Sequence, residues 1–129
     1  MEVDITRQYM EQVVPDLKEL IKSSLEDGKA ENVVTIDLAG KTDIADYMVI
    51  ATGTSTKHAS FLADKVIQNI RHTDSYGVYS VEGTSEGNWI LVDAGNVVVH
   101  IFKPGVRELY NLEKMWAMPL PEIEAIEVI

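Results

Sequence analysis

The sequence predicts an α/β fold in which a mixed five-stranded sheet carries helices on its faces. Apolar residues at helical and at strand spacing alternate along the chain in the order helix, two strands, helix, three strands, helix. Residues 47–51 (YMVIA) are apolar at both alternating positions, which is typical of a central strand covered on both sides. The 129 residues, 46% of them hydrophobic, are enough for one core, so we expect a single domain.

The first helix is expected at residues 15–27. Pro15 suits a first helical turn because its missing N–H has no partner there, and Gly28 ends the pattern. Residues 1–14 are predicted to form an N-terminal arm. The apolar positions of the helix are Leu17, Leu20, Ile21 and Leu25.

Two strands should follow. Residues 33–38 are rich in β-branched side chains, and residues 40–43 (GKTD) supply turn chemistry. The second strand, residues 47–51, is the interior strand of the sheet.

A second helix is predicted over residues 56–71. Ser55 or Thr56 can accept a hydrogen bond from a free backbone N–H at its start. Its apolar stripe recurs at spacings of three and four: Ala59, Leu62, Ala63, Val66, Ile67 and Ile70.

Three further strands are predicted at residues 78–82, 89–93 and 97–103. Residues 94–96 (AGN) favour a hairpin, so the last two strands should pair antiparallel. The second strand, the second helix and the third strand should form one right-handed crossover.

The chain should close with one short helix after Pro104-Gly105, followed by a C-terminal tail over residues 117–129. The tail contains two prolines and alternates acidic with aliphatic residues, which suits an extended edge or a loose end. The apolar positions of the helix are Val106, Leu109, Tyr110, Leu112 and Trp116.

Composition excludes several classes of function. The net charge is −10, which disfavours direct readout of nucleic acid but would attract a basic protein. The absence of cysteine removes disulfides and thiol catalysis, and no apolar run is long enough to cross a membrane. A signal-peptide pattern is also missing, so we expect a soluble protein of the cytoplasm.

The turn Thr52–Ser55 at the start of the second helix is the one candidate for a phosphate site. Free N–H groups and the positive end of a helix dipole meet at such a turn. An ordinary strand-to-helix turn with a hydroxyl cap is the favoured reading, because the further glycines or lysine of known phosphate loops are missing. The acids Asp43, Asp46 and Asp93 are too scattered to form a metal-binding pair for nucleotidyl transfer.

The three histidines His58, His72 and His100 lack the spacing of a zinc site, so no metal is expected. His100 should be a core histidine that donates to a backbone carbonyl or to Asp93. A catalytic triad of Ser55, His100 and Asp93 is disfavoured because Ser55 lacks the Gly-x-Ser-x-Gly elbow.

Trp89, Tyr110 and Trp116 either fill the space between sheet and helix or form an exposed anchor for a partner. Large aromatic residues with a polar group dominate protein interfaces. In the second case Arg107, Glu108, Glu113 and Lys114 would be the charged rim of the anchor; otherwise they form a solvated helix face.

Over residues 14–116 the chain resembles the ribosomal silencing factors, also called the Iojap family. The resemblance lies in the order and spacing of residues 29–64 (KAENVVTIDLAGKTDIADYMVIATGTSTKHASFLAD), 81–83 (VEG), 88–102 (NWILVDAGNVVVHIF) and 107–116 (RELYNLEKMW). Residues 15–116 are therefore predicted to be the silencing-factor domain, between the arm and the tail.

The resemblance implies a non-enzymatic repressor of translation that needs no cofactor. Such a protein binds the large ribosomal subunit through the fourteenth large-subunit protein, a basic protein on the intersubunit face, and blocks joining of the small subunit. The resemblance also implies a nucleotidyltransferase-like fold without catalytic acids, and a homodimer. The alternatives are a nucleotide-binding enzyme that uses the Thr52–Ser55 turn, and a general dimerisation module.

Transferred position by position, the resemblance places the partner surface at Trp89, Tyr110, Leu112, Glu113 and Arg107. Trp89 would be the central anchor, Tyr110 and Leu112 would extend the apolar patch, and Glu113 would pair with a partner lysine or arginine. Asp93 and His100 belong to the same motifs but are expected to set the geometry of the sheet.

Overall fold

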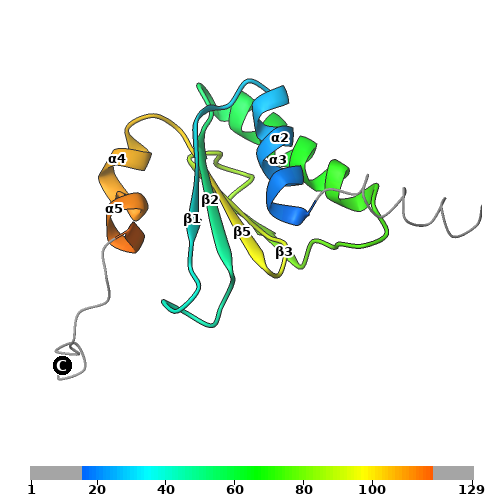
Figure 1. Ribbon diagram of the computed structural model, residues 1–129. Coiled ribbons are helices and arrows are strands. Elements are labelled where there is room, and N and C mark those ends of the chain that lie inside the picture. The colour runs from blue at the N-terminus through cyan, green and yellow to red at the C-terminus, as the bar shows by residue number, and fades with distance from the viewer. Residues whose placement is uncertain (1–15, 118–129) are drawn as a thin grey trace, which may run out of the picture.

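The computed structural model describes residues 16–117 and contains five strands and four helices in that range (Figure 1). The predicted arm and nearly all of the predicted tail lie outside the described residues. The elements, in chain order, are α2 (Leu17–Asp27), β1 (Glu31–Asp37), β2 (Tyr47–Thr52), α3 (Thr56–Arg71), β3 (Ser80–Glu82), β4 (Trp89–Asp93), β5 (Val97–Phe102), α4 (Val106–Tyr110) and α5 (Leu112–Ala117).

The five strands form one mixed sheet in the order β1-β2-β5-β4-β3. The β2–β5 pair is parallel and the other three pairs are antiparallel. The predicted fold class, the interior position of β2 and the antiparallel β4–β5 hairpin are therefore confirmed. The predicted crossover from β2 through α3 to β3 is also present, because β3 runs parallel to β2, but the β4–β5 hairpin lies between these two strands in the sheet.

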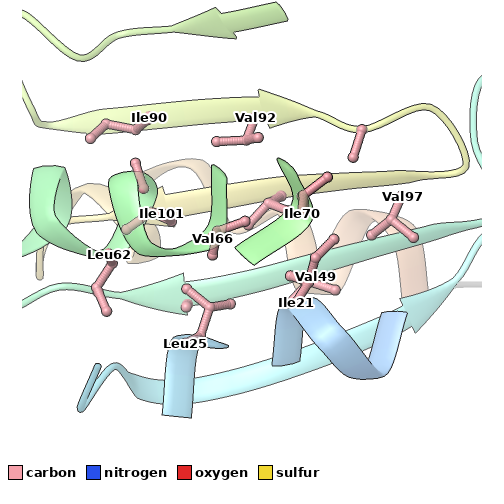
Figure 2. Close-up of a cluster of buried hydrophobic side chains, with 14 of the residues drawn as sticks. Ile21, Leu25, Val49, Leu62, Val66, Ile70, Ile90, Val92, Val97 and Ile101 are labelled. Carbon is pink, nitrogen blue, oxygen red and sulfur yellow. The ribbon is translucent and has the colours of Figure 1, made fainter. Parts of the chain in front are cut away.

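Helices cover both faces of the sheet (Figure 1). Helices α2 and α3 lie on one face and α4 and α5 on the other. The first face holds the larger core, in which alternate residues of the strands meet the apolar stripes of α2 and α3, as Figure 2 shows. Its fully buried members include Ile21, Leu25, Val49, Leu62, Val66, Ile70, Ile90, Val92, Val99 and Ile101.

A smaller cluster occupies the opposite face. Its buried side chains come mainly from the first three strands of the sheet order, and Trp89, Val106 and Leu112 pack partly buried against them. This cluster positions the site described below, because it seats β4, α4 and α5 together. Its buried members are Ile36, Leu38, Ala45, Met48, Ile50 and Phe102.

Local capping explains where the two long helices begin. The carboxylate of Asp16 accepts a hydrogen bond from the Glu19 N–H, so α2 begins at Leu17 and not at Pro15, which lies outside the described residues. Ser55 caps α3 in the same way by accepting from the His58 N–H at 3.0 Å. The predicted span and cap of α3 are confirmed.

Apart from shifts of one residue at strand ends, the structure differs from the prediction at three other places. Strand β1 begins earlier, at Glu31, through an irregular pairing in which Asn32 has a positive φ of 51°. Strand β3 is shorter than predicted and begins only at Ser80. The predicted final helix is two helices, because Asn111 adopts a left-handed conformation between α4 and α5.

Candidate partner-binding site

The candidate site lies on the α4–α5 side of the sheet and is centred on Trp89, the first residue of β4. Because strand side chains alternate, Ile90 and Val92 point into the larger core while Trp89 and Leu91 belong to the opposite face. The same alternation on β5 gives this face His100 and Phe102. The sheet therefore brings Trp89 and His100, eleven residues apart, into contact.

The indole of Trp89 is surrounded by three rings. Its centroid lies 5.0 Å from that of Phe102, 5.8 Å from that of His100 and 4.5 Å from that of Tyr110 on α4. Phe102 is fully buried, Trp89 is partly buried and Tyr110 remains 51% exposed. We call Trp89, Tyr110 and the exposed neighbouring Leu109 the aromatic patch. It is packed against the sheet through Trp89 and is exposed to solvent at Tyr110 and Leu109, so these aromatic residues do not only fill the space between sheet and helix.

His100 is hydrogen-bonded to Trp89 and not to Asp93. The indole Nε1–H donates to His100 Nδ1 at 2.8 Å, while the Asp93 carboxylate accepts from the Gly95 N–H in its own hairpin. His100 is buried as predicted, but the expected donation to Asp93 or to a backbone carbonyl is wrong: Asp93 lies opposite Val98 in the register, and the one hydrogen bond of the His100 ring within the described residues is that from Trp89. Burial lowers the pKa of His100 from 6.5 to about 4, so the ring is neutral at physiological pH.

Arg107 is buried and joins three elements. Its Nη1 donates to the Thr52 hydroxyl at the end of β2 at 2.7 Å, and its Nε and Nη2 donate to the two carboxylate oxygens of Glu113 on α5 at 2.8 and 2.9 Å. These hydrogen bonds hold the pKa of Glu113 below its ordinary value. We call this set of three residues the Arg107 latch.

The Arg107 latch changes the roles that we expect for two predicted site residues, Arg107 and Glu113. Arg107 is only 7% exposed, so it is not a rim charge that a partner can reach. Both carboxylate oxygens of Glu113 are already bonded within the chain, which leaves it poorly suited to pair with a partner lysine or arginine. Trp89 and Tyr110 lie together as predicted, and Leu112, the first residue of α5, packs partly buried against the smaller cluster. The side chain of Trp116 lies outside the described part.

The sequence did not single out the acidic side of the site. An open groove of about 670 Å³ runs from the aromatic patch to the β3–β4 hairpin, where Glu82 and Glu86 line it. A second, apolar hollow of about 330 Å³ adjoins it along Leu91 and His100. Glu82 belongs to the short segment Val81–Gly83 of the family motif, but only the pairing of β3 with β4 shows that this segment lies beside Trp89.

The Thr52–Ser55 turn is structural in this fold. The Gly53 N–H donates to the Phe102 carbonyl at 2.8 Å, and the Thr54 N–H donates to His58 Nδ1 at 2.9 Å. The other ring nitrogen of His58 donates to the Gly28 carbonyl, which ties the turn to the end of α2. Two of the N–H groups that a phosphate would need are thus engaged, as expected for an ordinary turn.

Within the described residues we find neither a group of metal ligands nor an assembled catalytic triad. Ser55 caps α3, while His100 and Asp93 have the separate partners given above, so the three are not joined as a triad. Within residues 16–117, no three His, Asp or Glu side chains are grouped to hold a metal ion. None of the helices in the same range is long and apolar enough to cross a membrane.

Comparisons with known proteins agree on one family. The family model described as ribosomal silencing factor during starvation matches residues 11–128. The ribosomal silencing factor RsfS of Zymomonas mobilis is 45% identical over 100 residues, which cover 78% of this chain and 74% of that protein. A mouse protein named mitochondrial assembly of ribosomal large subunit protein 1 is 31% identical over 104 residues, 78% of this chain but 45% of that protein. A crystal structure of a Chromobacterium violaceum protein, 33% identical, superposes with a TM-score of 0.77 over 83% of this chain and 88% of its own.

Proposed function

Because this chain belongs to the ribosomal silencing factor family, we propose that it represses translation by binding the large ribosomal subunit through the fourteenth large-subunit protein. In this proposal the bound domain occupies space that the small subunit needs, so the two subunits cannot join. No bond is made or broken, and the protein acts in the cytoplasm as a steric block.

The observation that carries the proposal is the exposed aromatic patch. Tyr110 is 51% exposed and Leu109 is 76% exposed, while Trp89 behind them is fixed by ring contacts and by its hydrogen bond to His100. Rigid aromatic residues at the centre of an interface supply most of its affinity at little cost in entropy. The net charge of −10 favours a basic protein as the partner of this patch.

Within this proposal the residues of the site have two kinds of role. Trp89, Tyr110 and Leu109 are the contact residues in this account. Leu112, Arg107 and Glu113 hold α4 and α5 against the sheet and so present Tyr110 in the correct place.

Subunit joining tests the proposal. Purified protein is added to separated subunits, the magnesium concentration is raised, and the fraction of whole ribosomes is measured by sedimentation. We expect that fraction to fall with increasing protein, and we expect the protein to sediment with the large subunit. Full re-formation of whole ribosomes at saturating protein would contradict the proposal.

The remaining expectations need separate tests. We propose that residues 15–116 are sufficient for binding, and that the protein is a homodimer in the absence of ribosomes. Light scattering of the purified full chain would give twice the monomer mass of 14.4 kDa. The nucleotide-binding alternative is not favoured by any observation at the Thr52–Ser55 turn.

A further inference from the structure

The groove beside the aromatic patch has two chemically different walls. Glu82 and Glu86 of the β3–β4 hairpin line it with carboxylates, and we call these two residues the acidic wall; Leu109 and Tyr110 of α4 line it with apolar and aromatic side chains. Trp89 and His100 line the groove from the sheet. A volume of about 670 Å³ is large enough for a few side chains of a bound segment.

The carboxylates of the acidic wall are unpaired within the described part of the chain. Glu82 and Glu86 are both exposed, and neither forms an ion pair or a side-chain hydrogen bond with another described residue. They line the same groove as the rings of Trp89 and Tyr110. Carboxylates together with aromatic faces are the surroundings that an arginine or lysine side chain prefers.

His100 supplies a second, independent indication of a ligand. The indole N–H of Trp89 can only donate, so Nδ1 of His100 must accept and the proton of the neutral ring must be on Nε2. This Nε2–H has no hydrogen-bond partner among residues 16–117, although His100 is only 7% exposed and lines the groove. Buried donors are nearly always satisfied, by protein or by water, so this Nε2–H is available to an acceptor that enters the groove.

We propose that the groove binds an extended basic segment of the protein partner on the large subunit. A lysine or arginine of that segment lies between the Glu82–Glu86 wall and the rings of Trp89 and Tyr110. A carbonyl oxygen of the same segment accepts the hydrogen bond from His100 Nε2. This inference rests on the proposed function and adds to it the chemistry that the site recognises.

A protein segment fits the groove better than ribosomal RNA does. Phosphate groups would be repelled by the two carboxylates, and the groove offers them no cationic side chain. The neutral His100 ring, with its pKa lowered by burial, presents one donor and no positive charge. Binding to protein-free ribosomal RNA with the affinity seen for whole subunits would overturn the inference.

The test compares two double variants, each of which lacks two negative charges, for binding to purified large subunits. The variant Glu82→Gln/Glu86→Gln removes two charges from the groove, and Glu26→Gln/Asp64→Asn removes two exposed charges from α2 and α3 on the other face. We expect the groove variant to bind about tenfold more weakly at low salt and to depend less on salt concentration. The control variant should bind within about twofold of the wild type.

His100 is tested by its own pair of variants and by a spectroscopic signal. The substitution His100→Gln keeps a donor and an acceptor, so this variant should bind large subunits with an affinity within about threefold of the wild type. The substitution His100→Leu removes both groups, so that variant should bind about tenfold more weakly than the wild type. In protein with ¹⁵N-labelled histidine, the Nε2 proton of His100 should become protected from exchange on adding the isolated fourteenth protein. A signal that exchanges as fast in the complex as in the free protein would overturn the role of His100.

The outcomes separate this inference from the proposed function. If the wild-type protein fails to bind large subunits, the proposed function fails. If the wild type binds, Trp89→Ala binds weakly, and both charge variants bind alike at every salt concentration, only the groove inference fails.

Discussion

Trp89 is the residue on which the proposed site depends, because its ring is in contact with both the core and the exposed surface. Phe102 and His100 fix it from the sheet, and Tyr110 covers part of it from α4. An aromatic side chain that is held in one orientation before binding loses little entropy in the complex. A truncation at Trp89 therefore removes an anchor and also disturbs the residues that surround it.

Two variants distinguish these effects. Trp89→Ala should weaken binding to large subunits by about 2 kcal/mol, which is about thirtyfold. It should also lower stability, since it removes ring contacts and leaves His100 Nδ1 without its donor. Tyr110→Ala, at a half-exposed position, should weaken binding about tenfold with a change in unfolding free energy below about 1 kcal/mol. Co-sedimentation and urea unfolding measure the two quantities, and unchanged binding of both variants would contradict the site.

His100 should make the fold sensitive to moderately acid pH. The unfolded chain binds a proton at this residue near its ordinary pKa of 6.5, but the folded chain does so only near pH 4 because the ring is buried. Between these values the unfolded state holds more protons, so stability falls as the pH falls. Over the full interval the loss should be roughly 3 kcal/mol, from about 1.4 kcal/mol per pKa unit.

A His100→Gln variant isolates this effect, because glutamine does not titrate. Urea unfolding of both proteins from pH 7 down to the acid limit of folding should show a steeper loss of stability for the wild type. Parallel curves for the two proteins would show that burial of the His100 ring does not control the acid sensitivity.

At the scale of elements, the Arg107 latch sets the position of α4 and α5. These two helices have only five and six residues, which is too short to be stable without tertiary contacts. Arg107 ties them to β2 through Thr52 and to each other through Glu113. The latch thereby keeps Tyr110 on the ring of Trp89.

Glu113→Gln should release part of this connection. At neutral pH we expect a loss of about 1–2 kcal/mol in unfolding free energy, a modest value because the Glu113 side chain is one-third exposed. Because the pKa of Glu113 is lower in the folded than in the unfolded protein, its ionised carboxylate stabilises the fold at every pH above the unfolded-state pKa. This stabilisation disappears as the pH falls through the folded-state pKa. Wild type and variant should therefore converge at strongly acid pH. A difference that persists there would show that the charge of Glu113 is not its cause.

Gly53 tests whether the β2–α3 turn serves packing or phosphate binding. A Cβ added at Gly53 would lie 2.9 Å from the backbone N and Cα of Ala59, so α3 would have to shift away from the sheet. Gly53→Ala should thus lower the unfolding free energy by about 1–3 kcal/mol. Calorimetry of the wild-type protein should show no saturable nucleotide binding. Saturable binding that Gly53→Ala abolishes would restore the phosphate reading.

The elements with strong local signals could be predicted from the sequence. The apolar stripe and hydroxyl cap of α3 fix both of its ends, and the Ala94–Asn96 turn fixes the β4–β5 hairpin. The break at Asn111 could not be predicted, since a left-handed residue between two short helices leaves the apolar spacing almost unchanged. The hydrogen bond between Arg107 and Thr52 could not be predicted either, because Thr52 lies 55 residues away and the parallel β2–β5 pair brings the two residues together.

For the molecule as a whole, the two faces of the sheet have different tasks. The face covered by α2 and α3 contains the larger core and gives the domain its rigidity. The opposite face combines a smaller core, the aromatic patch and the acidic groove. We expect a surface of this kind to be the one that meets the ribosome.

Hydrogen–deuterium exchange of the protein, free and bound to purified large subunits, tests this central claim most directly. The account predicts slower exchange on binding in residues 80–91 and 106–112, with α2 and α3 exchanging at unchanged rates. Protection confined to α2 and α3, with residues 80–91 and 106–112 exchanging as in the free protein, would contradict it.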